Sequence, residues 1–161
     1  MDLQIQQLLN DWKKNMNNVF LYNEILSQYK GECDNYWSDF LIIKAIEKID
    51  DFSNNDWDCL LMDLSHQNKN ELWYLAFFDT LSEVENYQYA LICCITIFHK
   101  MTHSVKVEII NTINAILANH SNQVDINIIN QIKNIANLFQ PQSELEKIVL
   151  NSLYLKLNKQ T

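Results

Sequence analysis

Glycine, proline and arginine are almost absent from this chain. Gly31 and Pro141 are the single glycine and the single proline among 161 residues, and all 12 basic residues are lysine. Sheets joined by tight turns usually need several glycines or prolines, because such turns need a positive or a pre-set φ. The shortage therefore predicts an all-α fold whose helices are joined by short polar loops.

The missing arginine and the net charge of −8 argue against direct binding of nucleic acid. Arginine is the preferred bidentate ligand for phosphate and for guanine edges. An acidic chain is also repelled by the phosphate backbone, which supplies most of the affinity in such complexes. A basic protein is a better match as partner.

Motifs for catalysis, metal binding and cofactor binding are missing as well. With one glycine, no phosphate-cradling loop can form, and GxSxG does not occur. His99 and His103 have the i, i+4 spacing of a helical metal site, but a helix start expected at Thr102 would separate them. Asp56 and Asp58 form a DxD pair that helix-terminal charge explains better. We therefore expect no enzymatic activity, no metal and no cofactor.

The cysteine pattern and the apolar runs indicate a cytoplasmic protein that does not cross a membrane. The four cysteines, which are Cys33, Cys59, Cys93 and Cys94, show no CxxC pair and no disulfide-scaffold spacing. Two of them stand side by side in the longest apolar run, 89–98, which is about half the length needed to span a bilayer. The N-terminus lacks the features of a signal peptide. We expect reduced, buried thiols.

Apolar residues recur at helical spacing along the whole chain. This spacing predicts about eight helices. The first covers residues 2–16, with a break or kink before a continuation to residue 30. The others cover 34–51, 54–66, 71–82, 86–99, 102–119, 123–139 and Pro141 to 158. Pro141 is expected in the first turn of the last helix, and Asn54 or Asn55 as the cap of the helix over 54–66. Segment 86–99 is rich in β-branched residues, so a strand is the alternative there.

The spacing of the later helices predicts a single domain over residues 1–161. Residues 1–51 form N-terminal helices, and residues 54–158 form three hairpins over 54–82, 86–119 and 123–158. Hairpin starts 32 and 37 residues apart are typical of helical repeats, so we expect antiparallel hairpins in a compact HEAT-like or solenoid-like array. The expected core faces are Trp57, Leu60, Leu61 and Leu64; Val107, Ile110, Ile113 and Leu117; Ile128, Ile132, Ile135 and Phe139; and Leu145, Ile148, Val149, Ser152 and Leu153.

All of the net charge lies in the first half of the chain. Residues 1–81 hold 14 acids and six lysines, whereas residues 82–161 hold six of each. Nine acids against two lysines fall within 31–63, and all four tryptophans are in the first half. Aromatic anchors among carboxylates that steer a basic partner are typical of a binding surface.

The candidate contact residues follow from this surface. They are Glu32, Asp34, Tyr36, Trp37, Asp39, Asp56, Asp58 and Asp63. Asp56 and Asp63 share a helix face, whereas Asp58 projects elsewhere, nearer Met62. The alternative is that the tryptophans are core and the acids are a solvated face. Trp57 itself lies on an apolar stripe and is expected in the core.

The segment over 54–82, NNDWDCLLMDLSHQNKNELWYLAFFDTLS, is similar to a HEAT-like helical hairpin. The chain is also acidic, expected to be all-α, and without catalytic motifs. With these features it resembles small bacterial immunity proteins of contact-dependent inhibition and other polymorphic toxin systems. The resemblance implies a cognate protein toxin as partner, and the acidic surface suits a basic nuclease domain. The alternatives are an acidic nucleic-acid mimic that inhibits a host or defence enzyme, and a helical adaptor with an apolar groove. The oligomeric state stays open.

Overall fold

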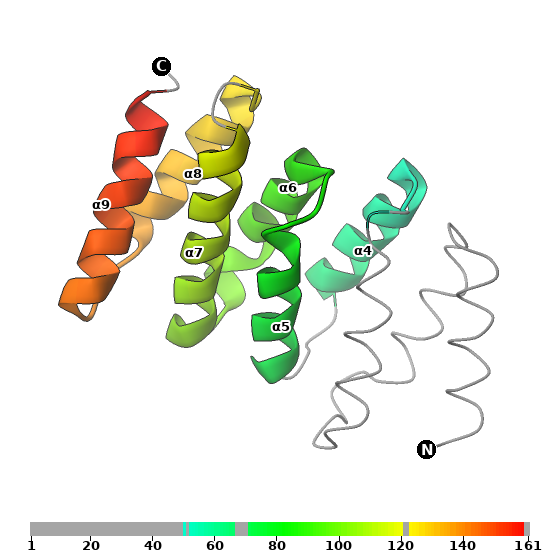
Figure 1. Ribbon diagram of the computed structural model, residues 1–161. Helices are drawn as coiled ribbons and strands as arrows, with labels where there is room; N and C mark the ends of the chain where they lie inside the picture. The colour runs from blue at the N-terminus through cyan, green and yellow to red at the C-terminus, as the bar shows by residue number, and fades with distance from the viewer. Residues whose placement is uncertain (1–49, 51, 67–70, 121–122, 160–161) are drawn as a thin grey trace. The chain divides into compact units, whose positions relative to one another are not determined.

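The protein is described by a computed structural model that covers residue 50 and residues 52–66, 71–120 and 123–159. Every regular element in these residues is a helix, as the sequence predicts (Figure 1). They are α4 (Asn54–His66), α5 (Glu71–Leu81), α6 (Tyr87–Ile97), the 3₁₀ helix η2 (Phe98–Lys100), α7 (His103–His120), α8 (Ile126–Leu138) and α9 (Glu144–Asn158). The helices predicted over 2–30 and 34–51 lie outside the described residues.

The chain divides into two compact units, residues 1–80 and 81–161. Helix α4 and nearly all of α5 belong to the first unit, and α6 to α9 belong to the second. Within the described ranges, no helix is long and apolar enough to cross a membrane.

Helix α4 begins at Asn54, one of the two residues expected to cap it. The Trp57 amide donates to the Ser53 carbonyl at 3.1 Å, so Asn54 and Asn55 lie inside the first turn instead of capping it. Three of the four predicted core residues, among them Trp57 and Leu60, are buried, and Leu61 is half-buried. The Phe52 ring packs edge-on against Trp57 at 5.7 Å.

Helix α5 is buried along most of the face that is described. Tyr74, Phe77 and Phe78 are buried, and the two phenylalanine rings meet edge to face at 5.1 Å. Glu71 is exposed in the first turn, where a carboxylate stabilises the positive end of the helix dipole.

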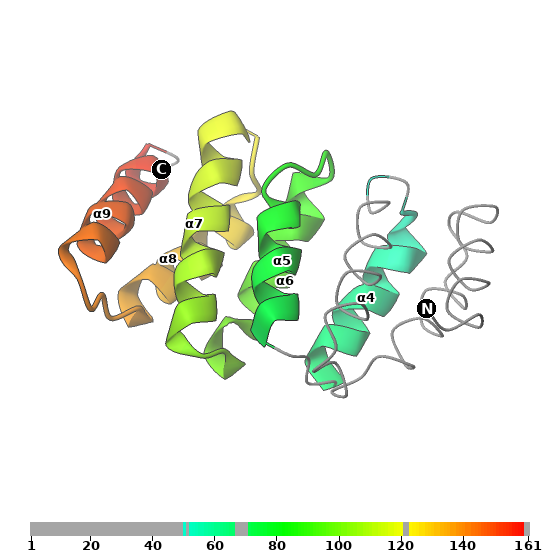
Figure 2. The ribbon, with the colours of Figure 1, turned by 60° about the horizontal axis from the view of Figure 1, so that its bottom comes forward.

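The second unit is built from two helix pairs in contact with each other. Helix α6 contacts α7, and α8 contacts α9, while α6 also contacts α8 and α7 contacts α9. In Figure 1, α7 and α9 lie in front of α6 and α8, and Figure 2 shows the same four helices turned by 60°. Each helix of this unit therefore has two helical neighbours to bury apolar residues against.

The segment over 86–99, for which a strand was the alternative, contains helix α6. Residues Tyr87–Ile97 are helical, and α6 contacts both α7 and α8. Of its β-branched residues, Ile97 is buried, and Ile92, Ile95 and Thr96 are half-buried. Its buried residues include Cys93 and Cys94, as expected, and neither forms a disulfide.

Helices α7 and α8 confirm most of their predicted faces. Ile110, Ile113 and Leu117 of α7 are buried, whereas Val107 is half-buried. All four predicted residues of the α8 face are buried, and that helix starts at a cap in which the Asp125 carboxylate accepts from the Asn127 amide at 2.7 Å.

Helix α9 overturns two expectations. Pro141 is not in its first turn, because Ser143 is the N-cap and the helix begins at Glu144. The predicted inward stripe is also wrong in part: Leu145 and Ile148 are exposed. The residues that the structure buries on this helix are Leu150, Leu153 and Leu157. Apolar residues occur on two faces of α9, and the contacts with α7 and α8 select only one of them.

Candidate functional site

Only part of the predicted acidic surface falls within the described residues. Glu32, Asp34, Tyr36, Trp37 and Asp39 lie outside them. The remaining three candidates are on α4, where Asp58 is exposed and the side chains of Asp56 and Asp63 are not described.

The outer face of α4 combines polar groups, a carboxylate and one large apolar side chain. Its exposed residues are Asn54, Asn55, Asp58 and Met62. Asp58 and Met62 are one turn apart and therefore neighbours on the helix, as the sequence predicts. Trp57 is fully buried, so it contributes to the core and not to this face.

A second polar cluster lies where the start of α7 meets the start of α9. His103 Nε2 and Glu146 Oε1 are 2.5 Å apart, and the two side chains are 32% and 17% exposed. The His103 ring stacks on Phe139, with ring centroids 5.5 Å apart and an interplanar angle of 11°. The contact between His103 and Glu146 joins residues 43 positions apart in the sequence.

Glu146 belongs at the same time to the cap of its own helix. The Glu146 amide donates to Ser143 Oγ at 3.1 Å, and the Ser143 hydroxyl donates to Glu146 Oε2 at 3.1 Å. The Gln142 amide donates to Glu146 Oε1 at 3.4 Å. The Ser-x-x-Glu spacing is that of a capping box, but this glutamate accepts from the Gln142 amide and the Ser143 hydroxyl instead of from the amide of the cap residue. It also contacts His103 of the neighbouring helix.

The surroundings of Glu146 lower the pKa of its carboxyl below the usual 4.5. Partial desolvation acts to raise the pKa, but the hydrogen bonds with His103, the Gln142 amide and Ser143, together with the charge of His103, outweigh it. The carboxylate is therefore charged at neutral pH, as its role of acceptor requires.

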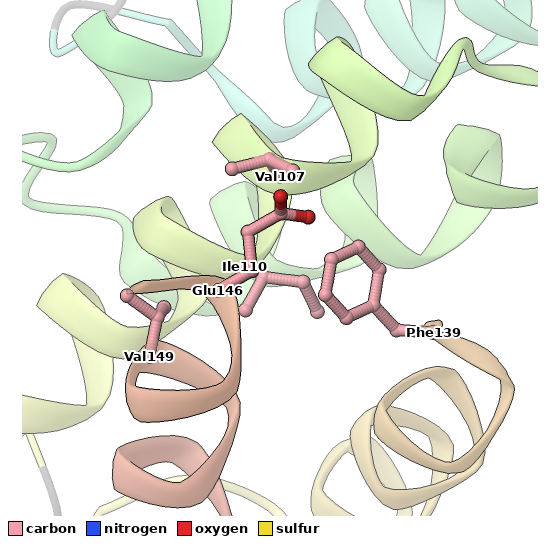
Figure 3. Close-up of a pocket in the computed structure, with 5 residues that line it drawn as sticks. All are labelled: Val107, Ile110, Phe139, Glu146 and Val149. Atoms are coloured by element: carbon pink, nitrogen blue, oxygen red, sulfur yellow. The ribbon is translucent and has the colours of Figure 1, made fainter. Parts of the chain in front are cut away.

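The order of these groups is that of a structural cluster and not of a catalytic triad. In a serine hydrolase the histidine stands between serine and acid, because it takes the proton from the nucleophile. Here Glu146 stands between Ser143 and His103. The depression beside the cluster is lined by Val107, Ile110, Phe139, Glu146 and Val149 (Figure 3). The depression is open to solvent, and its empty space of about 140 Å³ includes that open region, so it does not enclose a cavity of the ~300 Å³ found in the smallest usual ligand pockets.

The two thiols of α6, Cys93 and Cys94, are free and buried. Burial raises the pKa of Cys93 far above the ordinary range for a thiol, and burial together with the neighbouring Cys93 raises that of Cys94. Both are protonated at neutral pH, whereas nucleophilic attack and metal binding need the thiolate.

Metal binding finds no support in the part of the chain that the structure covers, where no three His, Cys, Asp or Glu side chains gather into a possible site. His99 lies in η2 and His103 opens α7, so the two histidines do not share one regular helix. That separation agrees with the expected break at Thr102.

Sequence reasoning missed the partnership of His103 with Glu146. The Ser143-x-x-Glu146 spacing could have revealed the cap at Ser143. Nothing in the sequence connects either residue to His103, because the contact arises from the packing of α7 on α9.

The comparisons with known proteins found no matching family model, no similar curated protein and no similar solved structure. The residues that the structure describes define an all-α fold.

Proposed function

We propose that this chain is an immunity protein that binds and neutralises a cognate toxin, a basic nuclease domain, through the acidic surface of its N-terminal half. The observation that carries the proposal is the concentration of charge: nine acids against two lysines within residues 31–63. Carboxylates in that density attract a positively charged nuclease cleft and would exclude its nucleic-acid substrate.

The exposure on α4 supports this use of the surface. Asp58 is exposed on this helix, and Met62 adds a flexible apolar contact one turn away; Asp50, which precedes α4, is exposed as well. The neighbouring Trp57 holds the helix in the core, so the carboxylate is presented from a packed element. Rigid presentation lowers the entropy lost on binding.

The proposed architecture is a compact array of antiparallel helical hairpins, HEAT-like in arrangement, within one cytoplasmic domain. The contacts of α6 with α7 and of α8 with α9, joined by those of α6 with α8 and α7 with α9, support such stacking in residues 81–161. Stacked hairpins supply extended surfaces for binding proteins.

The experiment is co-expression of the tagged protein with the products of its neighbouring genes. We expect recovery of one basic protein that is toxic alone and silent in the complex. Asp34→Asn, Asp39→Asn and Asp58→Asn, combined in one variant, should weaken this complex and restore toxicity. Glu83→Gln with Glu85→Gln is the control, because it removes exposed carboxylates of the second half.

The salt dependence of binding separates the adaptor hypothesis from the two hypotheses that rest on the acidic surface. The toxin and nucleic-acid-mimic hypotheses both predict an affinity that falls steeply with salt, and they differ in whether the target is a toxin or a host or defence enzyme. The adaptor hypothesis predicts little salt dependence. It is favoured by the exposed apolar side chains on α9.

A further inference from the structure

The outward face of α9 exposes an unusual amount of apolar surface. Leu145, Ile148 and Leu155 are 71%, 63% and 65% exposed. They make up half of the six large apolar side chains that are exposed in the described residues, and the other three are spread over α4 and the two ends of α8. Apolar exposure is thus concentrated on one helix, which is typical of an interaction surface.

This face is fixed in its outward orientation. At 100° per residue, Ile148 and Leu155 lie nearly opposite the middle of the buried stripe that contains Leu153. Helix α9 is held against α7, because Asn114 Nδ2 donates to the Val149 carbonyl at 2.9 Å. It cannot rotate to bury the exposed residues without losing its own core.

Further hydrogen bonds hold both sides of α9. Lys156 Nζ donates to Asn114 Oδ1 on α7 at 2.8 Å and to Ser152 Oγ at 2.7 Å. On the other side, the Tyr154 hydroxyl donates to Asn137 Oδ1 of α8 at 2.8 Å. The exposed face therefore lies between two anchored edges.

The exposed residues follow the spacing of a helix–helix seam. The exposed Leu145, Ile148, Leu155 and Lys159, with the half-buried Ser152 between them, are separated alternately by three and four residues, which is the a/d pattern of a coiled coil. Ser152 at the centre is small, so it allows a second helix to approach closely at that point.

We propose that this face is a self-association surface, on which α9 packs antiparallel against α9 of a second copy of this chain. In the a-to-d pairing of antiparallel helices, Leu145 meets Leu155 of the second copy and Ile148 meets its Ser152. A two-fold axis near residue 150 repeats each pair. All three exposed apolar side chains of each copy are then covered.

Charge fixes the antiparallel direction. Glu144 begins α9 and Lys159 follows its end. In the antiparallel register Glu144 lies within one turn of Lys159 of the second copy, an axial offset of about 4.5 Å that a lysine side chain can bridge. Parallel packing would set Glu144 against Glu144 and Lys159 against Lys159, and would also align the helix dipoles.

The second half of the chain also tolerates self-association electrostatically. Its six acids and six lysines give it no net charge, so two copies meeting there do not carry the repulsion of the acidic half into the interface. Glu144 already pairs with Lys147 at 3.0 Å, but exposed pairs of this kind are weak and can exchange partners.

The interface is small. Three apolar side chains per copy cover less than the ~800 Å² per partner of a standard interface. We therefore expect a weak dimer, with a dissociation constant between about 10 µM and 1 mM. This inference does not depend on the proposed toxin.

The test is sedimentation equilibrium of the full chain at concentrations that span this range. We expect a monomer–dimer equilibrium whose dissociation constant rises by at least about tenfold in Ile148→Lys or Leu155→Lys, since each change acts twice in a symmetric interface. Leu138→Lys is the matched control, because Leu138 is 60% exposed on α8 and lies outside the seam. Circular dichroism verifies that each variant is folded.

Charge reversal tests the direction of packing. Glu144→Lys and Lys159→Glu should each weaken the dimer, and the double variant should recover much of the loss. A chain that stays monomeric at 1 mM, or a dimer that Ile148→Lys leaves unchanged, overturns the proposal. A dimer in which the double variant is as weak as the single variants overturns the antiparallel register. A monomer whose α9 face binds a different protein overturns the second copy as occupant.

Discussion

The two halves of this chain differ in the balance of their charges. Residues 1–81 carry 14 acids and six lysines, whereas residues 82–161 carry six of each. Both halves bury large aromatic and aliphatic side chains, such as Phe77 in α5 and Phe98 in η2. Helices of the second half fold with balanced charge, so an acidic excess is not a requirement of helices like these.

The comparison teaches that the acidic excess needs an explanation outside folding. A concentration of like charge repels itself and destabilises the compact state. The first half of the chain carries this repulsion. We propose that its acidic residues serve to bind a basic partner. The second half instead exposes an apolar helix face, for which a second copy is the proposed partner.

Core truncation tests whether the two interiors are equivalent. We expect Phe98→Ala and Phe77→Ala each to lower the free energy of unfolding by about 3–5 kcal/mol, because both side chains are almost fully buried. Urea denaturation followed by circular dichroism measures the loss. Leu138→Ala is the exposed control and should change stability by less than about 0.5 kcal/mol. A loss below about 1 kcal/mol for Phe77→Ala alone would break the equivalence.

Removal of the α9 cap tests the local structure of the second half. Ser143→Ala removes the oxygen that accepts from the Glu146 amide, so we expect a loss of about 1 kcal/mol in the free energy of unfolding. Ser143→Asn keeps an acceptor at the cap and should recover most of the loss. If the alanine and asparagine variants were equally unstable, the hydrogen bond would not be the source of the effect.

The cluster around Glu146 gives the second half a specific response to acid. The pKa of Glu146 is lowered in the folded state from about 4.5 in the unfolded state. Its ionised form therefore stabilises the fold at higher pH, and this contribution is lost as pH falls below 4.5 through the folded pKa.

Comparison of the wild type with Glu146→Gln isolates this contribution. The difference between their urea midpoints should be constant above about pH 5.5 and should shrink steadily below pH 4.5. A difference that is the same at pH 3 and at pH 7 would show that the carboxylate charge has no part in stability.

The smallest expected effect is on the buried thiols. Cys93 and Cys94 should stay unmodified by iodoacetamide in the native protein at neutral pH, because burial keeps them protonated and inaccessible. Mass spectrometry of peptides from native and urea-unfolded protein reads out both residues. Rapid modification in the native state would show that α6 opens readily.

The helices of the second half could be read from the sequence because their apolar spacing is regular and no glycine interrupts them. Ile128, Ile132 and Ile135 of α8 form one narrow stripe, and the structure buries all three. Helix α9 has apolar residues on two faces, so spacing alone could not decide between Leu145 and Leu157 for the core. Contacts with α7 and α8 make that choice.

The candidate sites were less accessible to sequence reasoning. The burial of Trp57 and the exposure of Asp58 agree with their predicted positions on α4. The pairing of His103 with Glu146 depends on two helices that meet in space, which composition and spacing do not encode. The identity of the partner depends on a second molecule, so the basic toxin stays a proposal.

Removal of charge from each half of the chain, measured in the captured complex, tests whether the acidic first half binds a basic toxin. The first variant combines Asp34→Asn, Asp39→Asn and Asp58→Asn, and the second combines Glu83→Gln and Glu85→Gln. We predict that the first variant slows association with the basic partner, weakens binding and fails to suppress toxicity, while the second binds like the wild type. Equal binding by both variants, or loss of binding only in the second, would contradict the account.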